Sequence, residues 1–168
     1  IYWHHEKLVR ALPWIKRHKG LLTLADKLRA EKVPSTAGGD LKYIQTMATF
    51  LARKIELRLM LDKAYARGDR TGLRAVVKAV PAVIAALDRL DEAFRAQWLR
   101  RNKPFGLEVI QIRFAGQKRR YQELAQRIGE FLAGRIDRIE ELENLPDQPL
   151  TNGLRGEYRA LAAGTDIL

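Results

Sequence analysis

The sequence predicts an all-α protein, an antiparallel helical bundle of three long helices with shorter helices toward the N- and C-terminal ends. Apolar residues recur at spacings of three and four through most of the 168 residues, which is the period of an amphipathic helix. No segment alternates apolar and polar residues in the way that a half-buried strand requires. Glycine and proline gather in short segments between the periodic stretches, so the predicted helices follow one another through short connections.

We expect three regions along the chain. Residues 1–33 hold two short helical patterns and form a short helical segment that leads into the bundle. Residues 40–145 form the helical bundle domain, after a linker at residues 34–37. Residues 146–168 are expected to be a loosely ordered tail, because proline, asparagine and glycine interrupt the apolar pattern there. The chain starts at Ile1 without a basic and apolar leader, so we expect a processed product or a fragment of a longer protein.

The first long helix is predicted between Leu41 and Tyr65. Its apolar positions at helical spacing are Ile44, Ala48, Leu51, Ile55 and Leu59. The segment Gly38-Gly39-Asp40 in front of it is expected to be a loop that ends in an N-cap. The segment Arg67-Gly68-Asp69 behind it supplies a helix stop and a new N-cap, so the second helix should turn back along the first.

The second long helix is predicted between Leu73 and Trp98. Its apolar positions are Leu73, Val76, Val80, Ile84, Leu87, Leu90, Phe94 and Trp98. Pro81 lies inside this pattern and predicts a kink or a break near Ala79, because proline has no N–H for the helical hydrogen bond. The helix should end at Asn102-Lys103-Pro104.

The third long helix is predicted between Leu107 and Leu132, with Pro104 suited to the first turn. Its apolar positions are Leu107, Ile110, Phe114, Tyr121, Leu124, Ile128 and Leu132. Gly134 should end it, and residues 135–144 are expected to form a short terminal helix.

Composition excludes some classes of protein. The chain has no cysteine, so it holds no disulfide and no cysteine metal site, and no apolar stretch approaches the length of a membrane span. The formal net charge of +11 permits binding to nucleic acid, anionic lipid or acidic glycans. Most basic residues alternate with acidic ones along the helical patterns, however, and the basic runs are short. We therefore interpret the charge mainly as solvated helix surface.

No constellation of catalytic or metal-binding residues is visible. The three histidines lack the spacing that places two ligands on one helix face: His4, His5 and His18. No nucleophile turn or phosphate-binding loop occurs. Of the adjacent acidic pairs, Asp91-Glu92 lies on the predicted wet face between Arg89 and Arg95, whose charges would lower the pKa values of its carboxyl groups. We therefore expect no catalytic residue, no metal and no cofactor.

The segment from Trp98 to Glu108 contains a tryptophan and a Pro-Phe-Gly sequence that a plain turn between helices does not require. Trp98 and Phe105 could staple the two helices around Pro104 while Asn102 caps, which makes a structural motif of Asn102, Pro104, Phe105 and Gly106. Downstream, polar residues interrupt the apolar stripe at i, i+4 and i+7: Arg113, Gln117 and Arg120. Polar groups on an inner face must be hydrogen-bonded or meet another surface. Two interpretations stay open, a core staple with a buried network, or contact with a partner or substrate through Trp98, Arg113 and Arg120.

A second pattern extends from Trp98 to Glu123. It consists of Trp98, Asn102-Lys103-Pro104-Phe105-Gly106, Glu108, Arg113, Gly116 and Arg120, followed by Tyr121-Gln122-Glu123. This set resembles the helical C-terminal domain of certain bacterial family 20 glycoside hydrolases. The segments 57–69 and 121–143 are similar to the same domain, so the resemblance covers about residues 40–145. Ala115 departs from it, because a second glycine would be expected beside Gly116.

The resemblance implies a parent enzyme that removes terminal β-linked N-acetylglucosamine or N-acetylgalactosamine with a (β/α)8 barrel. In such enzymes the 2-acetamido oxygen of the substrate is the nucleophile, and an adjacent Asp-Glu pair assists it. A barrel needs about 250 residues and eight strands, so that pair has no matching position here, and mid-helix Asp91-Glu92 does not qualify. The expected role is a non-catalytic accessory domain. Its expected partners are the catalytic barrel of the parent chain and a second copy in a homodimer, with no membrane.

Two other functions stay open. One is a free-standing basic helical bundle that binds nucleic acid or another polyanion, although the alternating charges argue against it. The other is a small helical enzyme whose site forms between subunits from Arg53, Arg113 and Arg120.

Overall fold

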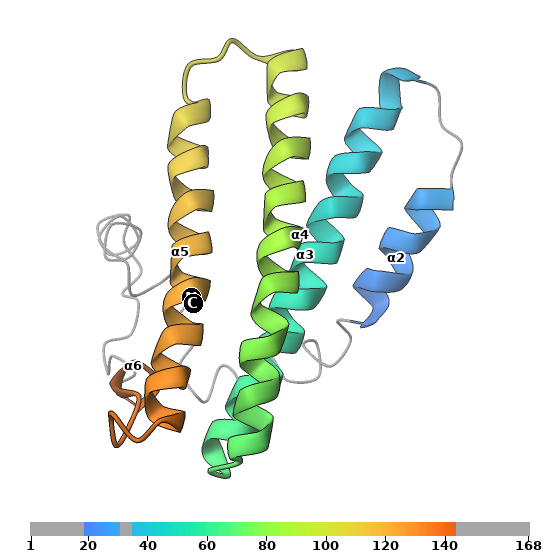
Figure 1. The fold of residues 1–168 in the computed structure, drawn as a ribbon. Coiled ribbons are helices and arrows are strands. Elements are labelled where there is room, and N and C mark those ends of the chain that lie inside the picture. Colours follow the sequence, from blue (N-terminus) through green and yellow to red (C-terminus); the bar gives the residue numbers. More distant parts are fainter. Residues whose placement is uncertain (1–18, 31–34, 144–168) are drawn as a thin grey trace, which may run out of the picture.

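The computed structural model describes residues 19–30 and 35–143, and in this part of the chain all regular structure is helical. The helices are α2 (Lys19–Ala30), α3 (Ser35–Ala66), α4 (Arg70–Arg101), α5 (Leu107–Leu132) and α6 (Glu140–Glu143). The three long helices run antiparallel, and α5, α4, α3 and α2 follow one another across the molecule (Figure 1). The predicted all-α bundle is confirmed. Among the described residues, none of the helices has the length and hydropathy needed to cross a bilayer.

The start of α3 differs from the sequence prediction. The helix begins at Ser35, so Gly38, Gly39 and Asp40 lie inside its first turns instead of in a loop. A Cβ on Gly39 would collide with the guanidinium group of Arg100 from α4, and Asp40 forms ion pairs with Arg100 and Arg101. Gly39 is therefore not part of a turn. It lies where the end of the flexible Arg100 side chain comes close to the α3 backbone. These tertiary contacts hold the segment in the helix although its propensity is poor.

The turn between α3 and α4 follows the prediction. Gly68 has a φ of 61° and the N–H of Gly68 donates to the carbonyl of Tyr65 at 3.0 Å. The N–H of Asp69 donates to the carbonyl of Ala64 at 2.9 Å, which completes a Schellman motif. Asp69 is also the N-cap of α4, since its carboxylate accepts from the N–H of Gly72 at 2.9 Å. One glycine and one aspartate thus end one helix and start the next.

Helix α4 continues through Pro81, so the break expected near Ala79 is wrong. Pro81 lies on the exposed side of the helix, where water can hydrate the carbonyl that loses its N–H partner. Its neighbours Val80 and Val83 are 3% and 2% exposed and pack into the core. Because burial on both sides of Pro81 fixes the helix, one missing hydrogen bond does not end it.

The core lies between α3, α4 and α5. Its largest fully buried side chains are Leu73, Leu87, Ile128, Ile139 and Val76. Burial of one such aliphatic side chain contributes about 1.5–3 kcal/mol. Helix α2 packs on the other side of α3 through small residues: Ala25, Ala48 and Ala52 are all buried.

The end of the bundle is shorter than predicted. Gly134 has a φ of 71°, and the N–H of Arg135 donates to the carbonyl of Glu130 at 3.0 Å, which again makes a Schellman motif. The helix expected over residues 135–144 is present only as the four residues of α6. Ile139 instead enters the core, where its N–H donates to the hydroxyl of Tyr65 at 3.0 Å. The predictions for residues 1–18 and for the tail fall outside the described residues.

Candidate interaction face at the α4–α5 end

The loop that joins α4 to α5 is held in one conformation by its own hydrogen bonds. Asn102 is the C-cap of α4, and its N–H donates to the carbonyl of Trp98 at 2.8 Å. The indole N–H of Trp98 donates to the carbonyl of Lys103 at 2.9 Å. The N–H of Gly106 donates to the carboxylate of Glu108 at 2.9 Å, and that of Leu107 donates to the carbonyl of Pro104 at 3.2 Å. The cap predicted at Asn102 is thus confirmed, whereas Pro104 lies in the loop and not in the first turn of α5.

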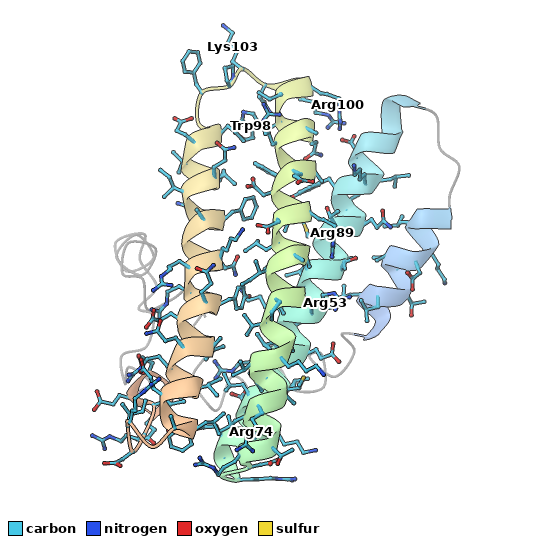
Figure 2. The ribbon with its side chains drawn as sticks, viewed as in Figure 1. Arg53, Arg74, Arg89, Trp98, Arg100 and Lys103 are labelled. Carbon is cyan, nitrogen blue, oxygen red and sulfur yellow. The ribbon has the colours of Figure 1, made fainter. Side chains whose placement is uncertain are left out.

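Trp98 and Phe105 behave differently from a staple between helices. Trp98 is half-buried and lies on the α5 side of α4, whereas Arg100 lies on the α3 side (Figure 2). Gly106 has a φ of 90°, and a Cβ there would lie 3.6 Å from the Trp98 ring. Phe105, however, is 81% exposed. Trp98 therefore supports the loop, and the loop holds Phe105 out into solvent.

Four aromatic rings support this end of the bundle from below. Phe94 is at their centre, with ring centroids 5.7 Å from Tyr43, 5.7 Å from Trp98 and 5.9 Å from Phe114. Tilted and edge-to-face pairs of this kind add about 0.5–1.5 kcal/mol each to area burial. The cluster links α3, α4 and α5, so Trp98, which contacts the loop, is packed against side chains of the bundle.

An ionic cluster fixes the same end on the α3 side. Asp40 accepts from the side-chain amide of Gln97 at 3.1 Å and forms ion pairs with Arg100 and Arg101. The hydrogen bond from Gln97, together with the charges of Arg101 and Arg100, holds the pKa of Asp40 below its usual value, although desolvation opposes this. The C-terminal turn of α4 is thereby tied to the first turns of α3.

One side of α5 next to the loop carries apolar residues that no part of the described chain covers. Val109 is 47% exposed and Ile112 is 70% exposed. Helical spacing places Val109, Ile112, Arg113 and Gly116 on one side of the helix. We call these four residues, together with Phe105, the outer α5 face. Sequence reasoning missed Val109 and Ile112, although both lie outside the predicted core stripe and could have been noticed for that reason.

The two arginines singled out from the sequence lie on the same side of α5. Arg113 is exposed and is not part of a buried network. Arg120 is half-buried, and its Nε is buried without a hydrogen-bond partner. Gln117, between them, is half-buried. Arg53 lies on α3, so it is on a different helix from Arg113 and Arg120 (Figure 2). A binding or interface role for Trp98, Arg113 and Arg120 stays a prediction.

The continuation of this side toward the end of α5 is covered by the chain itself. Arg127 pairs with Glu130 at 2.7 Å and with Glu141 at 3.1 Å. Ile139 and Leu142 line a small pocket here together with Arg120, Glu123, Leu124, Arg127 and Glu141. The segment between α5 and α6 therefore covers the lower part of a helix side whose upper part is bare.

The two acidic pairs lie on different helices, Asp91-Glu92 on α4 and Glu140-Glu141 on α6. Asp91 is half-buried, with one carboxylate oxygen buried and without a hydrogen-bond partner. Burial raises the pKa of Asp91, and the charges of Asp88 and Glu92 raise it further, so the lowering expected from flanking arginines is wrong. Glu141 is engaged by Arg127. The described residues contain no group of His, Asp and Glu side chains that could hold a metal ion, and His4, His5 and His18 fall outside them.

Comparison with known families identifies the bundle. A family model described as Glycoside Hydrolase 20C C-terminal domain matches residues 14–151. The match includes all of α2 to α6 and therefore the whole outer α5 face. No match to a curated protein was found. Because the family model covers 138 of the 168 residues, the resemblance found between Trp98 and Arg120 is confirmed, and the chain belongs to the family of Glycoside Hydrolase 20C C-terminal domains.

Proposed function

We propose that this chain is a non-catalytic accessory domain that packs on the catalytic barrel of a family 20 exo-β-N-acetylhexosaminidase through the outer α5 face. The parent enzyme would hydrolyse terminal β-N-acetylglucosamine or N-acetylgalactosamine by substrate-assisted retention. The observation that carries the proposal is Phe105, which is 81% exposed on a loop fixed by four hydrogen bonds. The family membership supports it, because a domain of that description accompanies a hydrolase.

The loop that carries Phe105 is held in place by hydrogen bonds, and the Phe105 side chain is nevertheless exposed. A mobile loop can expose an aromatic side chain without consequence, but the loop from Asn102 to Gly106 is held by Trp98 and Glu108. Phe105 is followed along α5 by Val109 and Ile112, which are also exposed. Contiguous exposed apolar residues mark interaction sites, and aromatic residues are enriched at the centres of interfaces. A fixed tip with an apolar flank is suited to dock on another folded surface.

Lys103 provides a test in the full-length parent polypeptide. It lies at the tip of the loop and is exposed (Figure 2). An amine-reactive cross-linker should join Lys103 to lysines of the catalytic barrel. Lys63 is the matched control, because it is equally exposed but lies at the opposite end of the bundle, in the last turn of α3. Coupling of Lys63 to the barrel without coupling of Lys103 would place the barrel on another surface and contradict the proposal.

Dimerisation is the second way in which an accessory domain could use this face. A mixture of isotope-labelled and unlabelled parent separates the two, since cross-links between copies carry one label each. Cross-links from Lys103 only between copies would favour dimerisation over packing on the barrel. In either case the chain alone should not hydrolyse a chromogenic N-acetylglucosaminide, and turnover that is lost on Asp91→Asn would overturn the non-catalytic role.

A further inference from the structure

We propose that the surface docking on the outer α5 face carries a carboxylate group, set between apolar side chains, that pairs with Arg113. This inference rests on the proposed function and names the chemistry of the partner, a carboxylate-bearing surface of the catalytic barrel. Three arginines lie at intervals of seven residues on α5: Arg113, Arg120 and Arg127. A seven-residue interval is nearly two helical turns, so the three lie in a row along one side of the helix.

The lowest of the three arginines shows what kind of segment fits this side of α5. Arg127 is covered by the segment after α5, in which Glu141 pairs with its guanidinium group at 3.1 Å. Ile139 and Leu142 flank that carboxylate and line the same pocket as Leu124 of α5. Ile139 is 1% exposed, so its side chain is buried beside the partly exposed ion pair of Arg127 and Glu141. One carboxylate between two aliphatic side chains therefore already fits the lower part of the row.

Arg113 has similar surroundings without the covering segment, whereas Arg120 lines the same pocket as Ile139, Glu141 and Leu142 of that segment. Arg113 forms no ion pair or hydrogen bond within the described residues. Arg120 has a buried Nε without a hydrogen-bond partner, and Glu141, which lines the same pocket, has a buried carboxylate oxygen without one. Val109 and Ile112 flank Arg113 as the apolar residues near Arg127 do. Arg113 thus repeats the pattern of an arginine with aliphatic neighbours, and it lacks the carboxylate that Arg127 has.

Charge complementarity selects an acidic occupant. The four helical neighbours of Arg113 are uncharged: Val109, Ile110, Gly116 and Gln117. The nearest acid along the helix, Glu108, is engaged by the N–H of Gly106. The chain as a whole carries a formal net charge of +11, so an acidic surface also gains from the wider field. A basic partner would have no carboxylate to meet on this face.

The test uses Arg113→Lys in the full-length parent polypeptide, treated with a carbodiimide that joins an amine directly to a carboxylate in ionic contact. The substitution keeps the positive charge and adds the amine. The expected product links position 113 to an Asp or Glu of the catalytic barrel, in a yield that falls as salt is raised. Arg74→Lys is the matched control, since Arg74 is exposed near the other end of α4 and forms no ion pair within the described residues.

Other products would overturn the inference. Coupling of position 113 to Asp147, Glu157 or Asp166 would show that the end of this chain covers the face. Coupling between labelled and unlabelled copies would show a second copy there. The absence of coupling above the level of Arg74→Lys, while Lys103 still cross-links to the barrel, would mean that the barrel docks without carboxylates. If Lys103 does not reach the barrel either, the proposed function itself fails.

A charge reversal gives an independent measurement. Arg113→Glu should lower the cross-linking of Lys103 to the barrel about tenfold, which corresponds to the loss of about 1.4 kcal/mol of docking free energy. Arg74→Glu should leave it unchanged. Equal yields in the two variants would contradict a pairing role for Arg113.

Discussion

The pKa of Asp91 shows why neighbours in sequence are poor guides to electrostatics on a helix. Arg89 lies two residues before Asp91 and points to a different side of the helix, whereas Arg95, four residues after it, lies on the same side. Asp88, three residues earlier, faces the same side, and its charge raises the pKa of Asp91 together with burial. Glu92 acts in the same direction, and only Arg95 opposes. The spacing of these charged residues can be read from the sequence. The burial of Asp91, which contributes most to its raised pKa, depends on the fold.

This raised pKa predicts the effect of pH on an Asp91→Asn variant. A carboxyl group whose folded pKa lies above its unfolded value destabilises the fold when ionised, and this penalty disappears as pH falls through the raised folded pKa. Asp91→Asn should therefore raise the Tm at pH 7, by no more than about 3 °C because the side chain is only half-buried. The gain over wild type should shrink as the pH is lowered toward 4. Thermal unfolding followed by circular dichroism checks this, with Asp62→Asn, in an exposed pair with Arg58, as the control that should not raise the Tm.

Helix ends were predictable where one residue type is required by backbone geometry. Gly68 and Gly134 both adopt positive φ at the end of a helix, and both were recognised from sequence. The start of α3 was missed because Gly39 lies beside the side chain of Arg100, sixty-one residues later. The terminal helix was predicted too long for a similar reason, since Ile139 leaves the helical pattern to enter the core, and only Glu140–Glu143 are helical. Local rules therefore locate helix ends, but distant contacts can override them.

Two glycine-to-alanine substitutions test the effect of the positive φ on stability. At Gly68, φ is 61° and an added Cβ meets nothing within 4 Å, so Gly68→Ala should lower the free energy of unfolding by about 1–2 kcal/mol through backbone strain alone. At Gly129, inside α5, an added Cβ also meets nothing within 4 Å, so Gly129→Ala should stabilise by about 0.4–1 kcal/mol. Urea unfolding measures both. Equal effects at the two positions would contradict the role assigned to the positive φ.

Tyr65 attaches the segment after α5 to α3 through its hydroxyl group. Its hydroxyl accepts from the N–H of Ile139 at 3.0 Å and donates to Glu143 at 2.7 Å, and its ring lies 5.9 Å from that of Phe131. Tyr65→Phe should keep the ring contact and lower the free energy of unfolding by about 0.5–1.5 kcal/mol. Amide hydrogen exchange at Ile139 should become faster. Tyr43→Phe is the control, because its ring packs on Phe94 and its hydroxyl makes no hydrogen bond within the described residues.

For the whole molecule, the sequence predicted the architecture better than the site. On α4 and α5 the core positions repeat with the helical period, so Leu73, Val76 and Ile128 could be assigned to a buried face from the sequence. On α3 the predicted stripe was partly wrong, since Ile44 and Leu51 are 43% and 38% exposed. The outer α5 face is defined by the opposite property, apolar residues that remain exposed. In the sequence, Val109 and Ile112 are distinguished only by lying outside the core stripe of α5. Phe105 illustrates the difficulty, since its place beside Pro104 suggested packing and the hydrogen bonds of the loop turn it outward.

The distinction between core and docking surface can be measured with two substitutions on α5. Ile112 is 70% exposed, so Ile112→Asp should change the free energy of unfolding of this chain by less than about 0.5 kcal/mol, yet it should strongly reduce cross-linking of Lys103 to the barrel in the parent. Ile128 is 0% exposed, so Ile128→Ala should cost about 2–5 kcal/mol of unfolding free energy. A large loss of stability from Ile112→Asp in the chain alone would mean that its own residues cover the face. The face would then belong to the fold, and the barrel would have to dock elsewhere.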